Sequence, residues 1–282
     1  MPAKIIDGKK VADRILGNIK KKVAKLKEKP GLAIIKVGNN PASEIYVGKK
    51  IKKAEELGFY VERHNLDENA SQDELFRIVD ESNQSKKIHG FIVQLPLPKH
   101  INEKLVVDGI LPHKDIDGFT PLSLGNLAND SSTMVPATAR GCMELIKSTG
   151  EKIDGKNAVI VGRSTIVGKP VALLLLQENA TVTICHSKTK NLAEHTKNAD
   201  ILFVAVGKAK LIKKDMVKKG AIVIDVGINR TLEGIVGDVD FENVKGVAGY
   251  ITPVPGGVGP MTIAMLLENT LKAMELGKGF MR

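Results

Sequence analysis

The chain has 282 residues, 43% of them hydrophobic and 26% charged, as is usual for globular proteins with one large or two medium α/β domains. Its longest apolar run, "VALLLL" (171–176), is far shorter than the roughly 20 residues of a membrane span, so we expect no membrane partner. The net charge of +10 would suit a nucleic acid, but aromatic residues are only 4% and tryptophan is absent, so bases would find few stacking platforms.

The first predicted element is a helix that carries the densest basic run, "KKKVAKLKEK" (20–29). Apolar residues recur along it at helical spacing and leave the lysines on the outer face; these residues are Val11, Ile15, Ile19, Val23 and Leu26. A solvated helix face is therefore favoured, and a basic nucleic-acid-binding protein stays open as an alternative.

The start of the chain and its cysteines predict the compartment. The stretch "MPAKIIDGKK" has no signal-peptide pattern, and Cys142 and Cys185 lie far apart without metal-ligand spacing. We therefore predict a cytoplasmic protein in a reducing compartment, with no metal site.

The next segments alternate between strands and helices. Strands are predicted at "GLAIIKVG" (31–38), "FYVERHNL" (59–66) and "GFIVQLPLP" (90–98), with helices over residues 40–58 and 71–85 between them. Continuous apolar strands joined by helices predict right-handed βαβ units and a parallel sheet.

The helix over residues 40–58 holds one lysine that is out of step with the others. Asn40 is predicted as its N-cap and Pro41 as its first residue. At about 100° per residue, Lys50 falls at the edge of the apolar stripe, one turn after Tyr46, whereas its neighbours Lys49, Lys52 and Lys53 project away from it. Geometry alone leaves two readings open: Lys50 snorkels to the surface, or it is desolvated for proton transfer.

Ligands of open parallel sheets gather at the carboxyl ends of the strands, and three polar residues of this block lie there. Gln94 interrupts a buried run and needs hydrogen-bond partners; the rigid Leu-Pro-Leu-Pro that follows favours a ligand contact over a structural bridge. Asp115 and Asp117 in "HKDIDGF" are, from the residues alone, better explained as turn aspartates.

A second alternating block follows. The segment 113–132 is rich in Gly, Pro, Asn, Ser and Asp, and we place the crossing between two domains near it. Further strands are predicted at residues 157–162, 181–186, 201–207 and 221–228, and the loop "YITPVPGGVGPMT" (250–262) leads into a terminal helix. The predicted fold class is therefore α/β with two domains.

The stretch "VIVGRSTIVGKPVALLLL" reads as strand, glycine turn and helix. Gly162 ends the strand and Gly168 opens the helix, with the spacing G-x-S-x-x-x-G in place of the usual G-x-G-x-x-G. Taken alone this motif is weak, and a turn without a ligand is an alternative. Its place in a βαβ unit points backbone N–H groups towards a pyrophosphate and favours a dinucleotide site.

The end of the following strand indicates which dinucleotide binds. An NAD site usually has an acidic residue there for the ribose hydroxyls, whereas this chain has Ser187 and Lys188 in "CHSKTK", with Arg163 in the glycine turn. Arg and Ser suit a 2′-phosphate, so NADP is predicted. His186 is read as a packing or stacking residue without a catalytic role.

With these motifs assembled, the chain resembles the bifunctional methylenetetrahydrofolate dehydrogenase/methenyltetrahydrofolate cyclohydrolase family over nearly its whole length. The resemblance rests on "NPASEIYVGKKIKKAEELG", "GFIVQLPLP", "HKDIDGF", "VGRSTIVGKP", "AIVIDVGIN", "VGDVDF" and "YITPVPGGVGPMT", in this order. It implies a folate-binding catalytic domain over residues 1–120, completed by the terminal helix (about 260–282), and a Rossmann-type NADP-binding domain over 140–258. The active-site cleft would lie between them.

The resemblance also implies roles for single residues. Lys50 would be the catalytic lysine, Tyr46 would lie against the folate ring, and Gln94 would support the lysine. Asp117 would anchor the pterin, and Pro255, Gly256 and Gly257 would line the folate cleft. The cofactor-binding positions would be Thr138, Gly162, Arg163, Ser164, Gly168, Ser187 and Ile228.

The implied activity is NADP-dependent oxidation of 5,10-methylenetetrahydrofolate followed by hydrolysis to 10-formyltetrahydrofolate, in a cytoplasmic homodimer. One segment departs from the family pattern: in "PATARG" (136–141), Ala137 and Ala139 replace a Cys and a Pro, which could change rates or cofactor pose. Two further alternatives stay open, a different oxidoreductase related to shikimate or amino-acid dehydrogenases, and a folate- and nucleotide-binding regulator without turnover.

Overall fold

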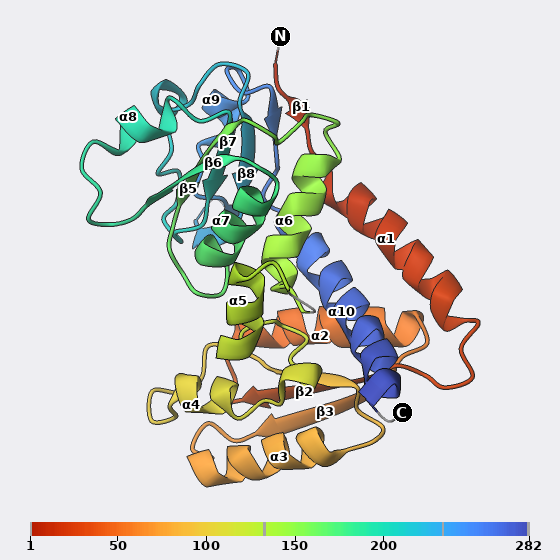
Figure 1. Cartoon of the computed structure of the whole chain (residues 1–282). Helices are drawn as coiled ribbons and strands as arrows, with labels where there is room; N and C mark the ends of the chain where they lie inside the picture. Colours follow the sequence, from red (N-terminus) through yellow and green to blue (C-terminus); the bar gives the residue numbers. More distant parts are fainter. Residues whose placement is uncertain (1, 132–133, 233, 281–282) are drawn as a thin grey trace. The chain divides into compact units, whose positions relative to one another are not determined.

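The computed structural model describes residues 2–131, 134–232 and 234–280. It divides into two compact units (Figure 1): unit 1 comprises residues 1–14 and 136–265, and unit 2 comprises residues 15–135 and 266–282. Two long helices, α1 (Gly8–Val23) and α10 (Val258–Phe280), contribute residues to both units.

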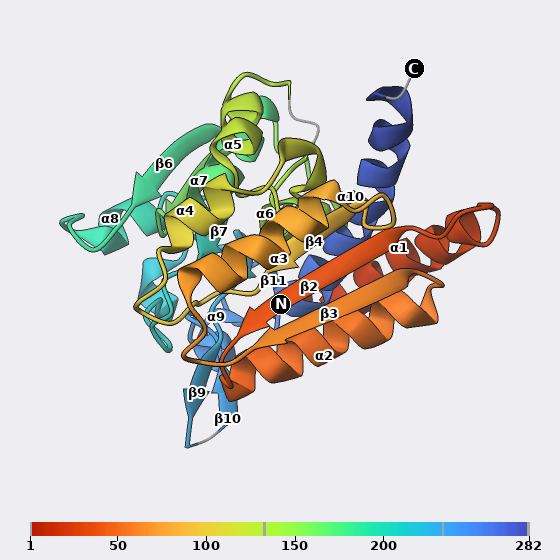
Figure 2. The ribbon, with the colours of Figure 1, turned by 90° about the horizontal axis from the view of Figure 1, so that it is seen from below.

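Unit 2 is built on a parallel three-stranded sheet with the order β3-β2-β4. Its elements are β2 (Gly31–Val37), α2 (Pro41–Glu56), β3 (Tyr60–Leu66), α3 (Gln72–Gln84), β4 (Gly90–Val93), α4 (Glu103–Asp108), the 3-10 turn η1 (Pro112–Lys114) and α5 (Pro121–Ala128). All seven residues of the central strand β2 are buried, as its continuous apolar run predicts. Helices α2 and α3 lie on opposite sides of this sheet (Figure 1), and α2 runs alongside β2 and β3 (Figure 2).

The register of unit 2 places residues of chemical interest on one face. Alternate residues of β2, among them Ile35 and Val37, pack with Leu75 and Val79 of α3 in one core cluster. Side chains alternate between the faces of a strand, so Lys36 and the residue after Val93, which is Gln94, lie on the other face, where α2 packs.

Unit 1 contains a six-stranded parallel sheet with the order β1-β11-β8-β7-β5-β6. Its strands are β1 (Lys4–Ile5), β5 (Asn157–Val161), β6 (Thr181–Cys185), β7 (Ile201–Val204), β8 (Ile222–Asp225) and β11 (Tyr250–Ile251), with a separate antiparallel pair, β9 (Asn229–Thr231) and β10 (Gly234–Val236). The helical segments are α6 (Ala137–Lys147), α7 (Gly168–Gln177), α8 (Leu192–Thr196), η2 (Lys214–Met216) and α9 (Phe241–Val244). The chain runs from β5 outward to β6 and then returns to β7 on the other side of β5, so the switch point for ligand binding lies between β5 and β7.

The strands predicted from the sequence are confirmed to within about three residues at each end, except that β4 ends at Val93 while the strand was predicted to reach residue 98; Pro96 and Pro98 have no N–H to donate to a neighbouring strand. Helix α5 is not predicted by the sequence pattern, because the segment 113–132 is rich in turn formers and indicates a crossing between domains. Two of these are helix-start signals, since the Thr120 side chain accepts a hydrogen bond from Ser123 N and Pro121 takes the first helical position. Within the ranges described, none of the helices combines the length and apolar character needed to cross a bilayer.

Candidate active site

The N-terminus of α2 sets the rotational phase of the whole helix. Asn40 Oδ1 accepts hydrogen bonds from Ala42 N (3.0 Å) and Ser43 N (3.1 Å), and Pro41 follows as the first helical residue. With this phase the Lys50 side chain is buried, at 4% exposure, while Lys49 and Lys52 are exposed and Lys53 is half-buried. The prediction from helical angle is therefore confirmed, and snorkelling is not how Lys50 is accommodated.

Lys50 is held between an amide and an aromatic ring. Its Nζ donates a hydrogen bond to Gln94 Oε1 (3.0 Å) and lies 4.8 Å from the centroid of the Tyr46 ring. Burial lowers the pKa of Lys50, and the nearby Asp117 carboxylate opposes that shift. A desolvated lysine with a lowered pKa can exchange a proton near neutral pH more readily than an exposed one.

The orientation of Gln94 is fixed by the main chain around it. Its backbone N donates to Ile35 O (2.8 Å), which continues the pairing of β4 with β2, and its Nε2 donates to Leu95 O (2.8 Å). Because the amide nitrogen is occupied in this way, the Oε1 oxygen is presented to Lys50. The polar residue that interrupts the buried run is thus a partner of Lys50.

The two aspartates of "HKDIDGF" differ in what surrounds them. Asp115 is buried and its carboxylate accepts hydrogen bonds from the backbone N–H groups of residues 118, 119 and 120 and from the Ser123 hydroxyl. This is the turn role that the residues predicted. Burial raises the pKa of Asp117 to about 6, the Lys50 ammonium acts against that rise and Asp115 adds to it. Asp117 therefore belongs to the electrostatic surroundings of Lys50.

Asn269 of α10 is a positioning residue that sequence reasoning missed. It is fully buried, and its Nδ2 donates to Ile116 O (2.8 Å) and Val135 O (2.9 Å). The first of these bonds holds the backbone directly before Asp117. A polar residue inside the apolar stretch "IAMLLENTLKAMEL" was the available signal, because a buried amide requires partners.

In unit 1, the glycine turn between β5 and α7 is shaped by close backbone contacts. Gly162 has φ +130, and a Cβ at this position would collide with Ala205 O; a Cβ at Gly168 would collide with Gly162 O. Ser164 Oγ accepts hydrogen bonds from Val167 N and Gly168 N, both at 3.2 Å, which fixes the start of α7. The backbone is packed too closely at both positions for any residue but glycine, and a tight glycine turn at a helix N-terminus fits a pyrophosphate.

The glycine turn after β5 and the turn after β6 carry the groups expected to meet a 2′-phosphate. Arg163, Ser187 and Lys188 are all exposed. His186 braces the turn in which two of them lie, since its Nδ1 accepts from Lys188 N (3.1 Å) and its backbone N donates to Thr189 Oγ1 (2.9 Å). The ring thus has a structural role in this turn, and the side chains of residues 163, 187 and 188 are available to a ligand.

The remaining predicted positions also lie in unit 1. Thr138, at the start of α6, shares a hydrogen bond with Thr262 (3.1 Å between their Oγ1 atoms), and the alanines on either side of it are buried in the helix. Ile228 is 61% exposed after β8. In the loop 255–257, Gly256 has φ +109 and its carbonyl accepts from Lys9 N (3.1 Å).

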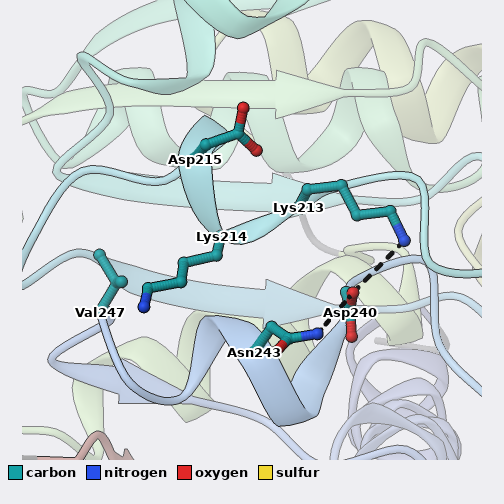
Figure 3. A pocket seen from close by; sticks show the side chains of 6 residues that line it. All are labelled: Lys213, Lys214, Asp215, Asp240, Asn243 and Val247. Atoms are coloured by element: carbon teal, nitrogen blue, oxygen red, sulfur yellow. Dashed lines mark hydrogen bonds and ion pairs between the residues drawn. The ribbon is translucent and has the colours of Figure 1, made fainter.

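Unit 1 also has a surface pocket of about 470 Å³ (Figure 3). It is lined by Lys213, Lys214, Asp215, Asp240, Asn243 and Val247. The Asp240 carboxylate accepts from Asn243 Nδ2 (3.0 Å) and forms an ion pair with Lys213 (3.3 Å), as Figure 3 shows. The residues predicted for folate or cofactor are not among those that line it.

Comparisons with known proteins identify two domains of one family along the chain. Residues 6–117 match the model of the tetrahydrofolate dehydrogenase/cyclohydrolase catalytic domain, and residues 136–278 match that of the NAD(P)-binding domain of the same family. A relative from Moorella thermoacetica, the bifunctional protein FolD, is 54% identical over 97% of this chain and 99% of its own length.

Two solved structures have the same fold over nearly the whole chain. The bifunctional FolD enzyme of Campylobacter jejuni has a TM-score of 0.95 and 47% identity, over 98% of this chain and 99% of its own. The Trypanosoma brucei enzyme, solved with NADP cofactor and an inhibitor, has a TM-score of 0.95 and 39% identity, over 99% of both chains. The predicted two-domain α/β fold and the resemblance drawn from the motifs are confirmed, and the chain belongs to the tetrahydrofolate dehydrogenase/cyclohydrolase family.

Proposed function

We propose that this chain is a bifunctional one-carbon folate enzyme. It oxidises 5,10-methylenetetrahydrofolate to the 5,10-methenyl cation with NADP and then hydrolyses that cation to 10-formyltetrahydrofolate. The observation that carries the proposal is the buried Lys50, held by Gln94 beside Tyr46. A regulator without turnover would have no need of a desolvated lysine fixed in this way, and family membership disfavours the other oxidoreductases.

The oxidation needs little acid–base help from the protein. NADP, when bound, accepts a hydride from the methylene carbon, and the flanking folate nitrogens stabilise the resulting cation. The protein's part is to position the reactants. Gly162, Ser164 and Gly168 shape the cradle for the pyrophosphate, and Arg163 with Ser187 would bind the 2′-phosphate. Thr138, Ile228 and the loop 255–257 complete the proposed set of ligand contacts.

Hydrolysis places a larger demand on the side chains. Water adds to the methenyl carbon and loses a proton, and a folate nitrogen must gain a proton before the ring opens. The remaining hydroxyl proton leaves to solvent as the formyl carbonyl forms. Neutral Lys50 can accept the first proton and return it as the ammonium, because burial lowers its pKa. Gln94 Oε1 and the Tyr46 ring keep Nζ in place, and Asp117 anchors the pterin.

The assignment of regions follows from these roles. We propose that residues 1–120, with the terminal helix from about 260 to 282, bind folate, and that residues 140–258 bind NADP. The family resemblance further supports a cytoplasmic homodimer without a nucleic-acid partner. Sedimentation equilibrium of the purified chain tests the dimer, and a salt-dependent gel shift with DNA or RNA tests the absence of nucleic-acid binding.

A spectrophotometric assay tests the proposed activity. Purified chain is mixed with 5,10-methylenetetrahydrofolate and either NADP or NAD, and formation of reduced cofactor and of the methenyl cation is followed. We expect turnover with NADP, weaker turnover with NAD, and loss of added methenyl substrate without any cofactor. Absence of turnover with both cofactors would refute the proposal and leave a binding protein in its place.

The pKa of Asp117 gives the site a pH dependence. This carboxyl has a pKa of about 6 and must be ionised to anchor the pterin, so the KM for methenyltetrahydrofolate should rise as pH falls through about 6.

The same carboxyl affects the stability of the fold in the other direction. Between pH 3.8, its ordinary pKa, and about pH 6, the carboxyl stays protonated in the folded chain and is ionised in the unfolded chain. This group's contribution to stability therefore declines as pH rises across that window.

The variant Asp117→Asn separates these two effects. It should remove the inflection in the plot of KM against pH and reduce the fall in stability between pH 3.8 and about 6. Part of that fall should remain, because burial also raises the pKa of Asp225 to about 6. KM and Tm are measured from acid to neutral pH on both proteins. An unchanged KM inflection in the variant would assign the titration to another group.

Arg163 is expected to determine the preference for NADP. A charge-assisted hydrogen bond to a phosphate contributes about 1.5–3 kcal/mol, so Arg163→Ala should raise the KM for NADP by roughly 10- to 100-fold. The KM for NAD, which lacks the 2′-phosphate, should stay within about twofold. Lys152→Ala removes an exposed positive charge elsewhere in unit 1 and serves as the matched control. Equal losses with both cofactors would contradict this role.

A further inference from the structure

The carboxylate of Asp238 binds three successive backbone amides of a loop that follows β7. Asp238 is fully buried. Its Oδ2 accepts from Val206 N (2.7 Å) and Gly207 N (2.9 Å), and its Oδ1 accepts from Lys208 N (2.8 Å). Oδ1 also accepts from Asn229 Nδ2 (2.8 Å), at the start of β9. An ionised carboxylate can accept all of these bonds at once, whereas a carboxamide of the same shape cannot.

The anchored loop borders the glycine turn. It leaves β7, the neighbour of β5, on the side of the topological switch point. The contact is direct: the carbonyl oxygen of Ala205, the residue before the anchored amides, occupies the space that a Cβ at Gly162 would need. The conformation of residues 205–208 is therefore part of the wall of the dinucleotide site.

Asp238 is itself fixed by a second buried aspartate. Asp225 Oδ1 accepts from Asp238 N (3.0 Å) and Gly227 N (2.9 Å), and Asp225 Oδ2 accepts from Val239 N (2.9 Å). The two glycines nearby leave room for the carboxylates, since a Cβ at Gly227 would collide with Asp238 and one at Gly237 with Asp225. The motifs "AIVIDVGIN" and "VGDVDF" thus interlock through their aspartates.

We propose that Asp238 is a positioning residue for the dinucleotide site: it fixes the loop 205–208 and thereby the wall next to the glycine turn. This inference rests on the cofactor role proposed for that turn. Asp238 does not touch the reacting atoms. Its effect should therefore appear in cofactor affinity, and the hydrolysis centred on Lys50, in unit 2, should not need it.

The variant Asp238→Asn tests this proposal. The amide would present N–H groups to backbone N–H groups, so the loop must shift while the side-chain volume stays the same. We expect the Kd of NADPH, from fluorescence titration, and the KM for NADP to rise at least tenfold. Hydrolysis of methenyltetrahydrofolate without cofactor should stay within twofold, and the circular dichroism spectrum should be unchanged.

Two further variants complete the design. Asp240→Asn makes the same change in charge two residues away, in the surface pocket of Figure 3, and should leave NADPH affinity unchanged. Asn229→Ala removes only the amide bond to Asp238 and should weaken NADPH binding by a smaller factor; it is decisive if Asp238→Asn does not fold.

The outcomes separate three cases. Selective loss of NADPH affinity supports the proposal. The proposal is overturned if both Asp238→Asn and Asn229→Ala bind NADPH with wild-type affinity. It is also overturned if a folded variant loses NADPH affinity and hydrolysis in parallel, because a residue with a purely structural role would give that result. If the wild-type chain itself binds no NADPH, the proposed function fails independently of Asp238.

Discussion

Replacing Lys50 by methionine is expected to abolish hydrolysis of the methenyl cation while the chain stays folded. General acid–base catalysis contributes typically about 10²- to 10⁴-fold, and the variant should lose at least that factor in kcat. Methionine has a similar length and no charge, so it can fill the same buried space. Because burial lowers the pKa of Lys50, the folded protein already disfavours the charged form, and removing the amine should not lower stability.

The measurement is the decay of methenyltetrahydrofolate absorbance, with corrections for its uncatalysed hydrolysis. Lys49→Met is the matched control, because Lys49 is the preceding residue of the same helix and is exposed. It should hydrolyse at the wild-type rate. A folded Lys50→Met protein with near-normal hydrolysis would remove this residue from the mechanism.

Replacing Gly162 by alanine is expected to weaken cofactor binding and oxidation while leaving hydrolysis intact, the reverse of the effect expected for Lys50→Met. The backbone there has φ +130, and the added Cβ would collide with Ala205 O, so the turn must move. A residue with a side chain rarely adopts this φ value, and the backbone strain alone costs about 1–3 kcal/mol of folding free energy. The collision adds to that cost. NADPH affinity and the dehydrogenase rate should therefore fall by at least about tenfold, while hydrolysis without cofactor persists.

Gly150→Ala is the control for backbone strain alone. Gly150 also has a positive φ, +79, but a Cβ added there would meet no heavy atom of the described residues within 4 Å. This variant should lose stability without losing NADPH affinity. If both alanine variants bind NADPH like the wild type, the glycine turn is not the cofactor cradle.

The position of Lys50 at the edge of the apolar face of α2 could be predicted from the sequence because it depends on local rules, whereas its burial could not be separated from snorkelling. A strong N-cap at Asn40 and Pro41 fixes where α2 begins, and the helical period then decides which lysine faces inward. The glycine turn is equally local, since strand, turn and helix follow one another directly over residues 157–177. In both cases the deciding interactions are close in sequence.

The partners of these residues could not be predicted in the same way. Gln94 was recognised as an unusual buried amide, but its partner Lys50 is 44 residues away. Asn269 and Ile116 are 153 residues apart, and Asp238 meets the amides after β7 from 30 to 32 residues away. Such contacts depend on strand order and register, which composition and periodicity do not determine. Only the resemblance to a family supplied the role of Lys50.

The most direct test of the central claim is a time course with 5,10-methylenetetrahydrofolate and NADP on the wild type and Lys50→Met. NADPH is followed by its fluorescence, and the folate products are separated by chromatography without acid. We predict that the wild type forms NADPH and 10-formyltetrahydrofolate with little methenyl intermediate. The variant should form NADPH with accumulated methenyltetrahydrofolate. Equal clearance of the methenyl intermediate by both proteins, or no NADPH from the wild type, would contradict the account.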